Sequence, residues 1–462
     1  MIILSIIIII IIIICLYYFY YYMINKKYSS DYGDVNRVKN QEYIKPKSIN
    51  ELSKFIIHNY YGKQRQLCIK GAGYSHGGHT LLENGIQIDM ININHIKYIN
   101  DDYIIVGGGC KWYDIIKFLL KYNKTLECIQ SYYNFSVGGS ISVNCHGRNT
   151  HKTISDTIKS LTIMLSTGEI IKCDRINNYE LFKGSIGGYG LLGIIIEAEI
   201  YIINNEIIEC TIIKNTLKNI YFPDKNYFQN NDVVYYNTII YPKTNKYVHC
   251  IWKKTKSIKV NKLKKIKEPK DQYYISPFME QLLRRFDIIK QIRPYYDNLI
   301  MDEFNNSKIS IMSYEIADDV NILKPLSHHP TTTILQEYFI PISRIYDFLN
   351  FFNTISYNQN ILNISVRYVN KINDSILNYA PIDSYAIVLY INIYNNNFGL
   401  NKLKLWTNKL LEKTIELSGK FYLPYLKVYD IKYINMMYDL NKIFLLKKKY
   451  DKYNIFKNFL EN

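Results

Sequence analysis

The sequence predicts an α+β protein of two domains, preceded by one transmembrane helix. Its 462 residues are too many for one ordinary hydrophobic core, so two domains are expected. Short apolar runs bounded by glycine alternate with helical patterns, and after residue 203 glycine occurs only at Gly399 and Gly419. We therefore predict a glycine-rich α+β domain at residues 45–203 and a second α+β domain at residues 204–420.

The N-terminal 23 residues have the composition of a membrane-spanning helix. No charged side chain occurs from Met1 to Met23, and Ile6–Ile14 is an unbroken isoleucine run. About 20 apolar residues suffice to cross a bilayer core as a helix. Lys26 and Lys27 follow the span, so the positive-inside rule predicts a single-pass anchor at residues 1–23 with the large domains in the cytosol. A cleaved signal peptide is the alternative, but neither a basic n-region nor a small-residue cleavage site is visible.

Between the anchor and the first domain, residues 24–44 are polar and lack apolar periodicity, which predicts a linker. The net charge of +17 favours contact with anionic partners, or it reflects only the lysine content of an AT-rich coding sequence. The Lys253–Lys270 stretch carries nine of these lysines and is either a solvated loop or a cationic flap near an anionic lipid or phosphosugar. We find no motif for specific nucleic-acid binding.

The eight cysteines contain no CxxC pair, so a metal site, a redox dithiol and a disulfide scaffold are not expected. Periodicity places the remaining elements in order. In the glycine-rich domain it predicts a helix over Tyr113–Tyr122 and strands at Leu67–Lys70, Ile86–Met90, Tyr103–Val106 and Ile194–Ile202. In the second domain it predicts strands at Tyr235–Tyr241, Thr332–Ile340 and Ala386–Ile393, and helices at Ser343–Thr354 and Leu403–Leu417.

Three glycine clusters in the first domain carry the chemistry. Gly71–Gly78 follows a predicted strand, Ser136–Asn149 combines a glycine pair with Ser, Asn and His, and Gly184–Gly193 runs into an apolar strand. Small residues let the backbone approach a ligand closely, with N–H groups directed at a pyrophosphate. One such turn is common, but three within one domain are more specific. The Rossmann fingerprint GxGxxG is absent from the first cluster.

In this order the clusters resemble the vanillyl-alcohol oxidase superfamily, the FAD-linked oxidases with a PCMH-type FAD-binding domain. Gly71–Ser75 is similar to the GxGHS loop of that family, and Val137–Gly139 is similar to its VGG segment. Gly187–Ile195 is similar to its GGxGxxGII segment, and Leu446–Phe456 to its closing KKYDPxNxF. The resemblance implies a two-subdomain FAD-binding domain, a substrate (cap) domain, and a C-terminal segment at residues 421–462 that returns to the FAD domain.

The same resemblance implies which residues hold FAD. They are Gly71, Ala72, Gly73, Tyr74, Ser75, His76, Gly77, Ser136, Val137, Gly138, Gly139, Ser142, Val143, Asn144, His146, Gly147, Gly190, Ile194, Ile195 and Tyr422. Many relatives bond FAD covalently to the histidine of GxGHS, but the matching residue here is Tyr74, so noncovalent FAD is expected. His76 could instead only cap a turn, and His146 could be a buried histidine bonded to the backbone.

Candidates for catalysis come from three segments. Cys145–Asn149 resembles the HGxN segment of decaprenylphosphoryl-ribose oxidases, whereas the HWGK-type segment of the aldonolactone oxidases is missing. Gly419–Tyr425 resembles the segment that carries an active-site lysine in the ribose oxidases, but Tyr425 stands at that position and Lys427 lies two residues on. The predicted catalytic residues are Tyr425, Lys427, His76, Gln336 and Glu337. Strand alternation separates Gln336 from Glu337 without showing which of them meets substrate.

The expected activity is oxidation of an alcohol group of a small sugar, sugar lactone or polyol. Its hydride would pass to the flavin, and its proton to a base among Tyr425, Lys427 and His76, with Lys427 lowering the pKa of Tyr425. Oxygen or another acceptor would reoxidise the flavin. One alternative is the oxidase component of an epimerase acting on a lipid-linked phosphosugar; another is a flavin-binding module without turnover.

Overall fold

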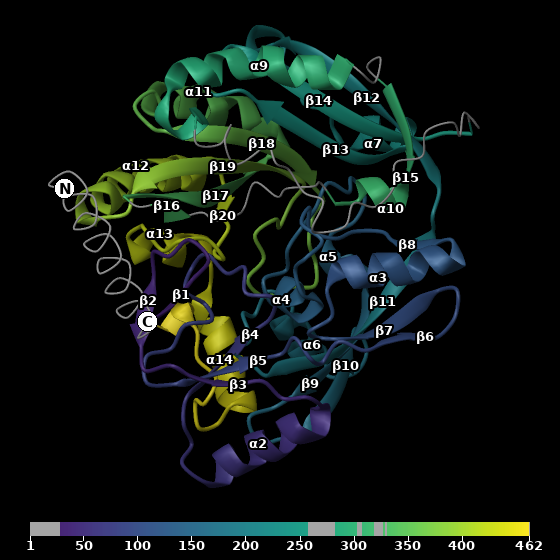
Figure 1. The fold of residues 1–462 in the computed structure, drawn as a ribbon, viewed down its shortest axis with the longest axis vertical. Helices are drawn as coiled ribbons and strands as arrows, with labels where there is room; N and C mark the ends of the chain where they lie inside the picture. Colours follow the sequence, from purple (N-terminus) through teal and green to yellow (C-terminus); the bar gives the residue numbers. More distant parts are fainter. Residues whose placement is uncertain (1–27, 257–281, 303–306, 318–326, 329, 462) are drawn as a thin grey trace, which may run out of the picture.

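The computed structural model describes residues 28–256, 282–302, 307–317, 327–328 and 330–461. The predicted anchor at residues 1–23 and most of the Lys253–Lys270 stretch lie outside these ranges. Among the described residues, no helix is both long and apolar enough to cross a membrane. Figure 1 shows two small sheets in the lower half of the molecule and one large sheet in the upper half.

The glycine-rich domain consists of two subdomains, each built on its own sheet. The first is a three-stranded parallel sheet in the order β3-β5-β4, formed by Glu42–Ile44, Ile86–Asp89 and Leu67–Lys70. Helix α2 (Ile49–Tyr61) packs Leu52 and Ile56 into the core of this sheet, and Ser48 caps the helix by accepting a hydrogen bond from the Glu51 N–H.

The second subdomain is a six-stranded antiparallel sheet in the order β10-β9-β11-β7-β6, with β8 paired to the far end of β11. Its strands are β6 (Ile96–Tyr98), β7 (Tyr103–Gly107), β8 (Lys124–Leu126), β9 (Ile158–Met164), β10 (Ile170–Asp174) and β11 (Ile194–Asn204). The helices of this subdomain are α3 (Trp112–Leu119), α4 (Val137–Ser142), α5 (Ile154–Thr157) and α6 (Tyr179–Ser185). The strands and the helix expected from periodicity in this domain are all present.

The second domain, called the cap domain below, is one nine-stranded sheet in the order β15-β12-β14-β13-β18-β19-β17-β16, with β20 paired to β17. Its strands are β12 (Ile207–Thr216), β13 (Val233–Ile240), β14 (Lys246–Lys254), β15 (Ser307–Ile311), β16 (Ser327–His328), β17 (Thr331–Pro341), β18 (Ile361–Val369), β19 (Ser384–Tyr394) and β20 (Lys420–Phe421). Its helices are α7 (Lys225–Asn230), α9 (Asp287–Asp302), α10 (Met312–Glu315), α11 (Ile345–Ile355), α12 (Asn397–Glu416) and α13 (Ile431–Met437). In Figure 1, α9, α11 and α12 lie on the outer side of the sheet, so its other face meets the glycine-rich domain.

The described part of the predicted linker, residues 28–44, forms strands rather than an unstructured connection. Strands β1 (Tyr28–Ser30) and β2 (Arg37–Lys39) pair antiparallel, and residues 42–44 form β3. The turn of this hairpin contacts both domains, because the Tyr32 N–H donates to the Ser75 carbonyl (2.8 Å) and the Thr332 hydroxyl donates to the Gly33 carbonyl (2.6 Å). Pairs this short are stabilised by tertiary contacts, which periodicity does not detect.

The C-terminal segment contacts the glycine-rich domain close to its predicted start at residue 421, because the Tyr422 hydroxyl donates to the Val143 carbonyl (2.9 Å) and His79 forms a hydrogen bond with the Pro424 carbonyl (2.9 Å). Strand β20 stays in the cap sheet, and α13 packs on α12. Helix α14 (Leu440–Tyr450) packs on α6, and Phe456 then forms a parallel bridge to Leu67 at the edge of the three-stranded sheet. The buried Asp451 carboxylate holds this end, because it accepts from the Ile455 and Phe456 N–H groups and from Lys447.

Candidate active site

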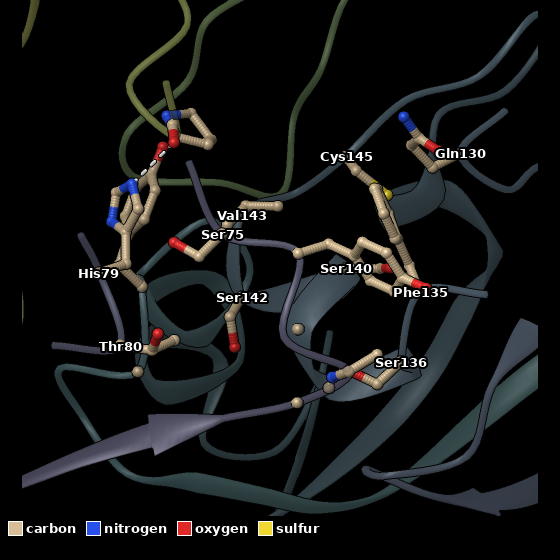
Figure 2. A pocket seen from close by; sticks show the side chains of 18 of the residues that line it. Ser75, His79, Thr80, Gln130, Phe135, Ser136, Ser140, Ser142, Val143 and Cys145 are labelled. Atoms are coloured by element: carbon tan, nitrogen blue, oxygen red, sulfur yellow. Dashed lines mark hydrogen bonds between the residues drawn. The ribbon is translucent and has the colours of Figure 1, made fainter. Parts of the chain in front are cut away.

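A cavity lies between the two domains, and all three glycine clusters contribute to its lining. Its empty volume, including the part open to solvent, is about 1370 Å³. Figure 2 shows His79 and Thr80 on one side of this cavity and Gln130, Phe135 and Cys145 on the other, with Ser142 between them. The cavity therefore extends from the glycine-rich domain to the cap domain.

The first two clusters approach each other so closely that they have no room for larger residues. A Cβ added at Gly71 would lie 1.9 Å from the Ser136 Oγ, and that oxygen accepts a hydrogen bond from the Ala72 N–H (3.2 Å). The second cluster is not a loop, because residues 137–142 form the short helix α4. The ligand-facing wall is thus made of backbone from the two clusters.

Unpaired polar groups in this wall fit a phosphate-bearing cofactor. The backbone N–H groups of residues 73–76 donate to no other described residue. The buried Ser75 hydroxyl likewise has no hydrogen-bond partner within the described part of the chain. Successive free N–H groups form a concave anion site, and hydroxyls complete such a site. These residues therefore fit the pyrophosphate of FAD.

Most of the sequence-predicted FAD residues line the cavity. They are Gly71, Ala72, Gly73, Tyr74, Ser75, His76, Ser136, Gly138, Gly139, Ser142, Val143, His146, Gly190, Ile195 and Tyr422. Five others do not: Gly77, Val137, Asn144, Gly147 and Ile194. Val137 and Ile194 are fully buried in hydrophobic cores, and Gly147 is packed against the Ile129 carbonyl. Gly77 is packed against the carbonyls of Pro424 and Tyr425. Gly77, Val137, Gly147 and Ile194 therefore pack beneath the cavity lining and are not part of its surface.

The two histidines of the first cluster both line the cavity and are buried. His79 forms a 2.9 Å hydrogen bond with the Pro424 carbonyl, drawn as the dashed line in Figure 2, and its ring stacks on Tyr189. His76 lies edge-on to Tyr32 and 6.1 Å from the Tyr425 ring. Burial lowers the pKa of His76 to about 4 and that of His79 to about 3. Both are therefore neutral at physiological pH, and His76 is a weak proton acceptor.

Strand β17 carries Gln336 and Glu337, and only Glu337 faces the cavity. Glu337 lines it, and its Oε1 lies 2.5 Å from the His146 Nε2. Gln336 points to the opposite face, where its amide donates to Thr407 of α12 and its oxygen accepts from Tyr338. Glu337 is 2% exposed and Gln336 is fully buried, so alternation along β17 places one in the site and the other in the core of the cap domain.

Tyr425 also lines the cavity, beside Glu337. Its pKa is raised well above its ordinary value, first by burial and then by the negative charge of Glu337, to which it is hydrogen bonded. The expected lowering of this pKa by Lys427 is wrong, because Lys427 is exposed and does not line the cavity. Residues 422–430 do not form a strand, so alternation does not place Lys427 next to Tyr425. The cation that faces Tyr425 is Arg367.

Sequence reasoning missed several residues of the lining. Among them are Gly108, Gln130, Cys145, Tyr189 and Arg367. The Gly107–Gly109 run after a predicted strand was a usable signal, of the same kind as the three clusters. Arg367 had no local signal, because it comes from the middle of β18 and reaches the site only through the cap sheet.

Comparisons with known proteins agree with this geometry. Residues 41–174 match the FAD binding domain family. The chain is 28% identical to cytokinin dehydrogenase 2 of Arabidopsis thaliana over 176 residues, which are 37% of this chain and 35% of that protein. It is 26% identical to the D-arabinono-1,4-lactone oxidase of Candida glabrata over 167 residues, 35% of this chain and 32% of that protein.

A third relative is an oxidoreductase of the fasciation locus of Rhodococcoides fascians, 24% identical over 173 residues, 37% of this chain and 39% of that protein. The matches thus span between 32% and 39% of the length of these relatives. The match to the FAD domain includes the first cluster and α4, which supply the free N–H groups and the close backbone approach. Residues 41–174 are thus similar to the FAD binding domain family, and FAD is the cofactor of this protein.

Proposed function

We propose that this protein oxidises an alcohol group of a sugar, a sugar lactone or a polyol, and that oxygen or another acceptor reoxidises its flavin. The observation that carries the proposal is the buried Glu337 carboxylate in the wall of the FAD cavity, joined to His146 and Tyr425. Oxidising an alcohol requires a group that removes the hydroxyl proton, and a carboxylate is such a group. Similarity to a D-arabinono-1,4-lactone oxidase supports a sugar lactone as substrate.

Different residues of the cavity wall bind the cofactor, accept the proton and orient the substrate. The backbone N–H groups of residues 73–76 and the hydroxyls beside them hold the cofactor. When bound, FAD supplies the two-electron acceptor. Glu337 accepts the substrate hydroxyl proton, and His146 fixes the orientation of its carboxylate. Tyr425 stays protonated and donates a hydrogen bond, and Arg367 on the same wall contacts an electronegative substituent of the substrate.

Anaerobic titration of the full chain in detergent tests this function. Sugars, sugar lactones, polyols and phosphosugars are added in turn, and loss of the visible flavin absorbance is followed. Bleaching by a sugar, lactone or polyol is the expected result. Bleaching by phosphosugars alone would favour the epimerase component instead. If no alcohol bleaches the flavin, the protein is a flavin-binding module without turnover and the proposal fails.

We also propose that the FAD is held without a covalent bond, because Tyr74 stands in the wall where many relatives carry the bonding histidine. Denaturing precipitation then leaves the yellow colour in the supernatant. A yellow pellet would show covalent attachment, with His76 and His79 as the residues to substitute next, since both line the cavity.

Membrane attachment through residues 1–23 is a further proposal, supported by their uncharged, isoleucine-rich composition. The cytosolic side follows from the lysines after the span. Expressed cells are fractionated, and the membrane pellet is washed with alkaline carbonate. Full-length protein is expected to stay in the pellet, and a variant lacking residues 2–23 is expected in the supernatant. Release of the full-length chain by the wash would contradict an anchor.

A further inference from the structure

Helix α9 of the cap domain presents apolar side chains outward. Ile288, Ile292 and Tyr295 are spaced i, i+4 and i+7, which places them on one face of the helix. They are 59%, 48% and 61% exposed, respectively. Helix α9 lies at the top of the molecule in Figure 1, on the outer side of the cap sheet. The described part of the chain thus leaves one apolar stripe open to solvent.

The opposite face of α9 is polar and holds the helix on the cap sheet. Lys290 is 2% exposed, and its ammonium donates to the Asn360 side chain (2.5 Å). Arg293 donates to the Leu362 carbonyl of β18 (3.0 Å) and forms an ion pair with Asp297 (3.1 Å). A surface helix ordinarily packs its apolar face inward and exposes its polar face. Helix α9 has the reverse arrangement, so its apolar face is available to a partner.

Cations border the apolar stripe. Arg285 is exposed two residues before the helix, and the Lys246 ammonium lies 3.7 Å from the centre of the Tyr295 ring. Residues 253–270, which precede the helix in the sequence, contain nine lysines and a single acidic residue, Glu268. An apolar stripe bordered by positive charge matches a partner that offers both apolar groups and negative charge.

Another exposed aromatic side chain extends this surface at the first turn of α9. Tyr357, in the connection between α11 and β18, is 76% exposed, and the Lys243 ammonium lies 4.3 Å from the centre of its ring. Lys243 is also near α9, because the pKa of Asp287 is lowered first by its hydrogen bond from Lys290 and further by the charge of Lys243. The start of α9 and the α11–β18 connection therefore share one aromatic and cationic surface.

An anionic lipid bilayer fits these features better than a second copy of the chain. An amphipathic helix lies in the headgroup region of a bilayer with its apolar side chains toward the acyl chains and its lysines and arginines at the headgroups. Anionic headgroups attract such cations. A second copy would instead bring the same cations together, and like charges repel.

We propose that the outer face of α9 docks on an anionic lipid bilayer, with Ile288, Ile292 and Tyr295 toward the acyl chains and Arg285 and Lys246 at the headgroups. The docking holds the cap domain on the membrane surface. It depends neither on an anchor at residues 1–23 nor on which alcohol the FAD site oxidises.

Quenching of tryptophan emission by brominated lipid tests the docking in the FAD-loaded full chain. The three native tryptophans are buried, so Ile292→Trp adds an exposed reporter to the stripe. The probe is a vesicle of phosphatidylcholine and phosphatidylglycerol with bromine atoms on the acyl chains. Amphipathic helices bury their apolar face by about 5–10 Å, so about half or more of the emission added to that of the wild type should be quenched.

Tyr61→Trp is the matched control, because Tyr61 is 80% exposed at the end of α2, which lies at the bottom of the molecule in Figure 1. Its added emission should not be quenched. Equal quenching at both positions would overturn docking through α9. A full-length chain that floats with the vesicles while Ile292→Trp stays unquenched would overturn the docking and leave the anchor intact. A chain that does not float would overturn both.

Charge reversal tests whether the bilayer must be anionic. In the Ile292→Trp chain, Arg285→Glu/Lys246→Glu should reduce quenching by at least ~2-fold, because two cations are lost from the headgroup region. Lys54→Glu, which reverses an exposed charge on α2, should leave quenching unchanged. Flavin absorbance should be the same in all of these variants. Undiminished quenching in the double variant, or equal quenching by pure phosphatidylcholine vesicles, would overturn an anionic bilayer as the partner.

Ile288→Ser tests the apolar contact. Because Ile288 is mostly exposed, the substitution should preserve the fold and weaken the quenching of the Ile292→Trp reporter. Unchanged quenching would remove the stripe from the interface. Self-association that Ile288→Ser abolishes, measured by light scattering, together with no quenching by lipid, would assign the stripe to a second copy of the chain and overturn the proposal.

Discussion

The two walls of the FAD cavity recognise their ligands by different means. The wall from the glycine-rich domain offers backbone N–H groups, and Gly71 and Ser136 approach each other so closely that an added methyl group would clash. The wall from the cap domain offers the side chains of Glu337 and Arg367 from two strands of a large sheet. Binding by the first wall requires small residues that leave the backbone N–H groups accessible. Binding by the second wall requires particular side chains to face the cavity. Under the proposed function, the first wall holds the cofactor and the second selects the substrate.

Replacing Glu337 by Gln should have the largest effect, because it removes the proposed proton acceptor and keeps the shape of the side chain. The rate of anaerobic flavin reduction should fall by ~10²–10⁴-fold, the usual contribution of general base catalysis. FAD content, measured after denaturation, should stay at one per chain, because the cofactor is held by the other wall. An unchanged rate of reduction would remove Glu337 from the mechanism.

The neighbouring residue Gln336 is the matched control for that experiment. Gln336→Leu breaks the hydrogen bonds to Thr407 and Tyr338 inside the cap domain, so it should lower the free energy of unfolding by about 1–3 kcal/mol. Flavin reduction by the folded fraction should stay near the wild-type rate. A loss of rate as large as that of Glu337→Gln would show that the role in catalysis is not confined to the face of β17 that carries Glu337.

The histidines of the backbone wall should make the protein less stable in acid. Burial lowers the pKa of His76 to about 4 and of His79 to about 3, whereas an unfolded histidine titrates near 6.5. The unfolded chain therefore binds more protons as the pH falls below 6.5, and each histidine should cost about 2 kcal/mol of stability by pH 5. Asp31 should offset about 1 kcal/mol of this loss, because burial raises its pKa to about 6 and the folded protein therefore binds this proton before the unfolded chain does.

Urea unfolding of the wild type, His76→Asn and His79→Asn at pH 7.5 and pH 5 measures this effect. The loss of stability between the two pH values should be smaller in each variant than in the wild type. The same acid-induced loss in all three proteins would show that these histidines are not buried neutral in solution.

Gly71→Ala should shift the backbone that faces the cofactor, with a smaller effect than the substitutions above. The new Cβ would lie 1.9 Å from the Ser136 Oγ, so the loop must shift at a cost of about 1–3 kcal/mol. FAD should bind correspondingly more weakly, measured by flavin release on dilution. Gly71→Ala/Ser136→Ala removes the clashing oxygen and should recover part of the affinity. No recovery in the double variant would show that the loss has another cause.

Lys427→Ala should have the smallest effect. Because Lys427 is exposed and outside the cavity lining, flavin reduction should stay within about twofold of the wild-type rate and stability within about 0.5 kcal/mol. A large loss of rate would restore the sequence-based prediction that Lys427 assists Tyr425.

The secondary structure of both domains was largely predictable, because burial imposes regular patterns. Strands such as β7 and β17 and helices such as α3 and α12 lie where apolar spacing predicts them. The hairpin of β1 and β2 was missed, since its strands are three residues each and are held by contacts with distant residues such as Ser75 and Thr332.

For the site, the sequence by itself indicated where the backbone approaches a ligand closely, because close approach requires glycine and glycine is visible in a sequence. The resemblance to the vanillyl-alcohol oxidase superfamily was needed to identify that ligand as FAD. The catalytic wall was not visible in that way. Alternation separates Gln336 from Glu337, but only packing against α12 shows that Gln336 faces inward to the cap domain and Glu337 faces the cavity. Arg367 meets Tyr425 because two distant segments converge on one cavity, and no local pattern records that convergence.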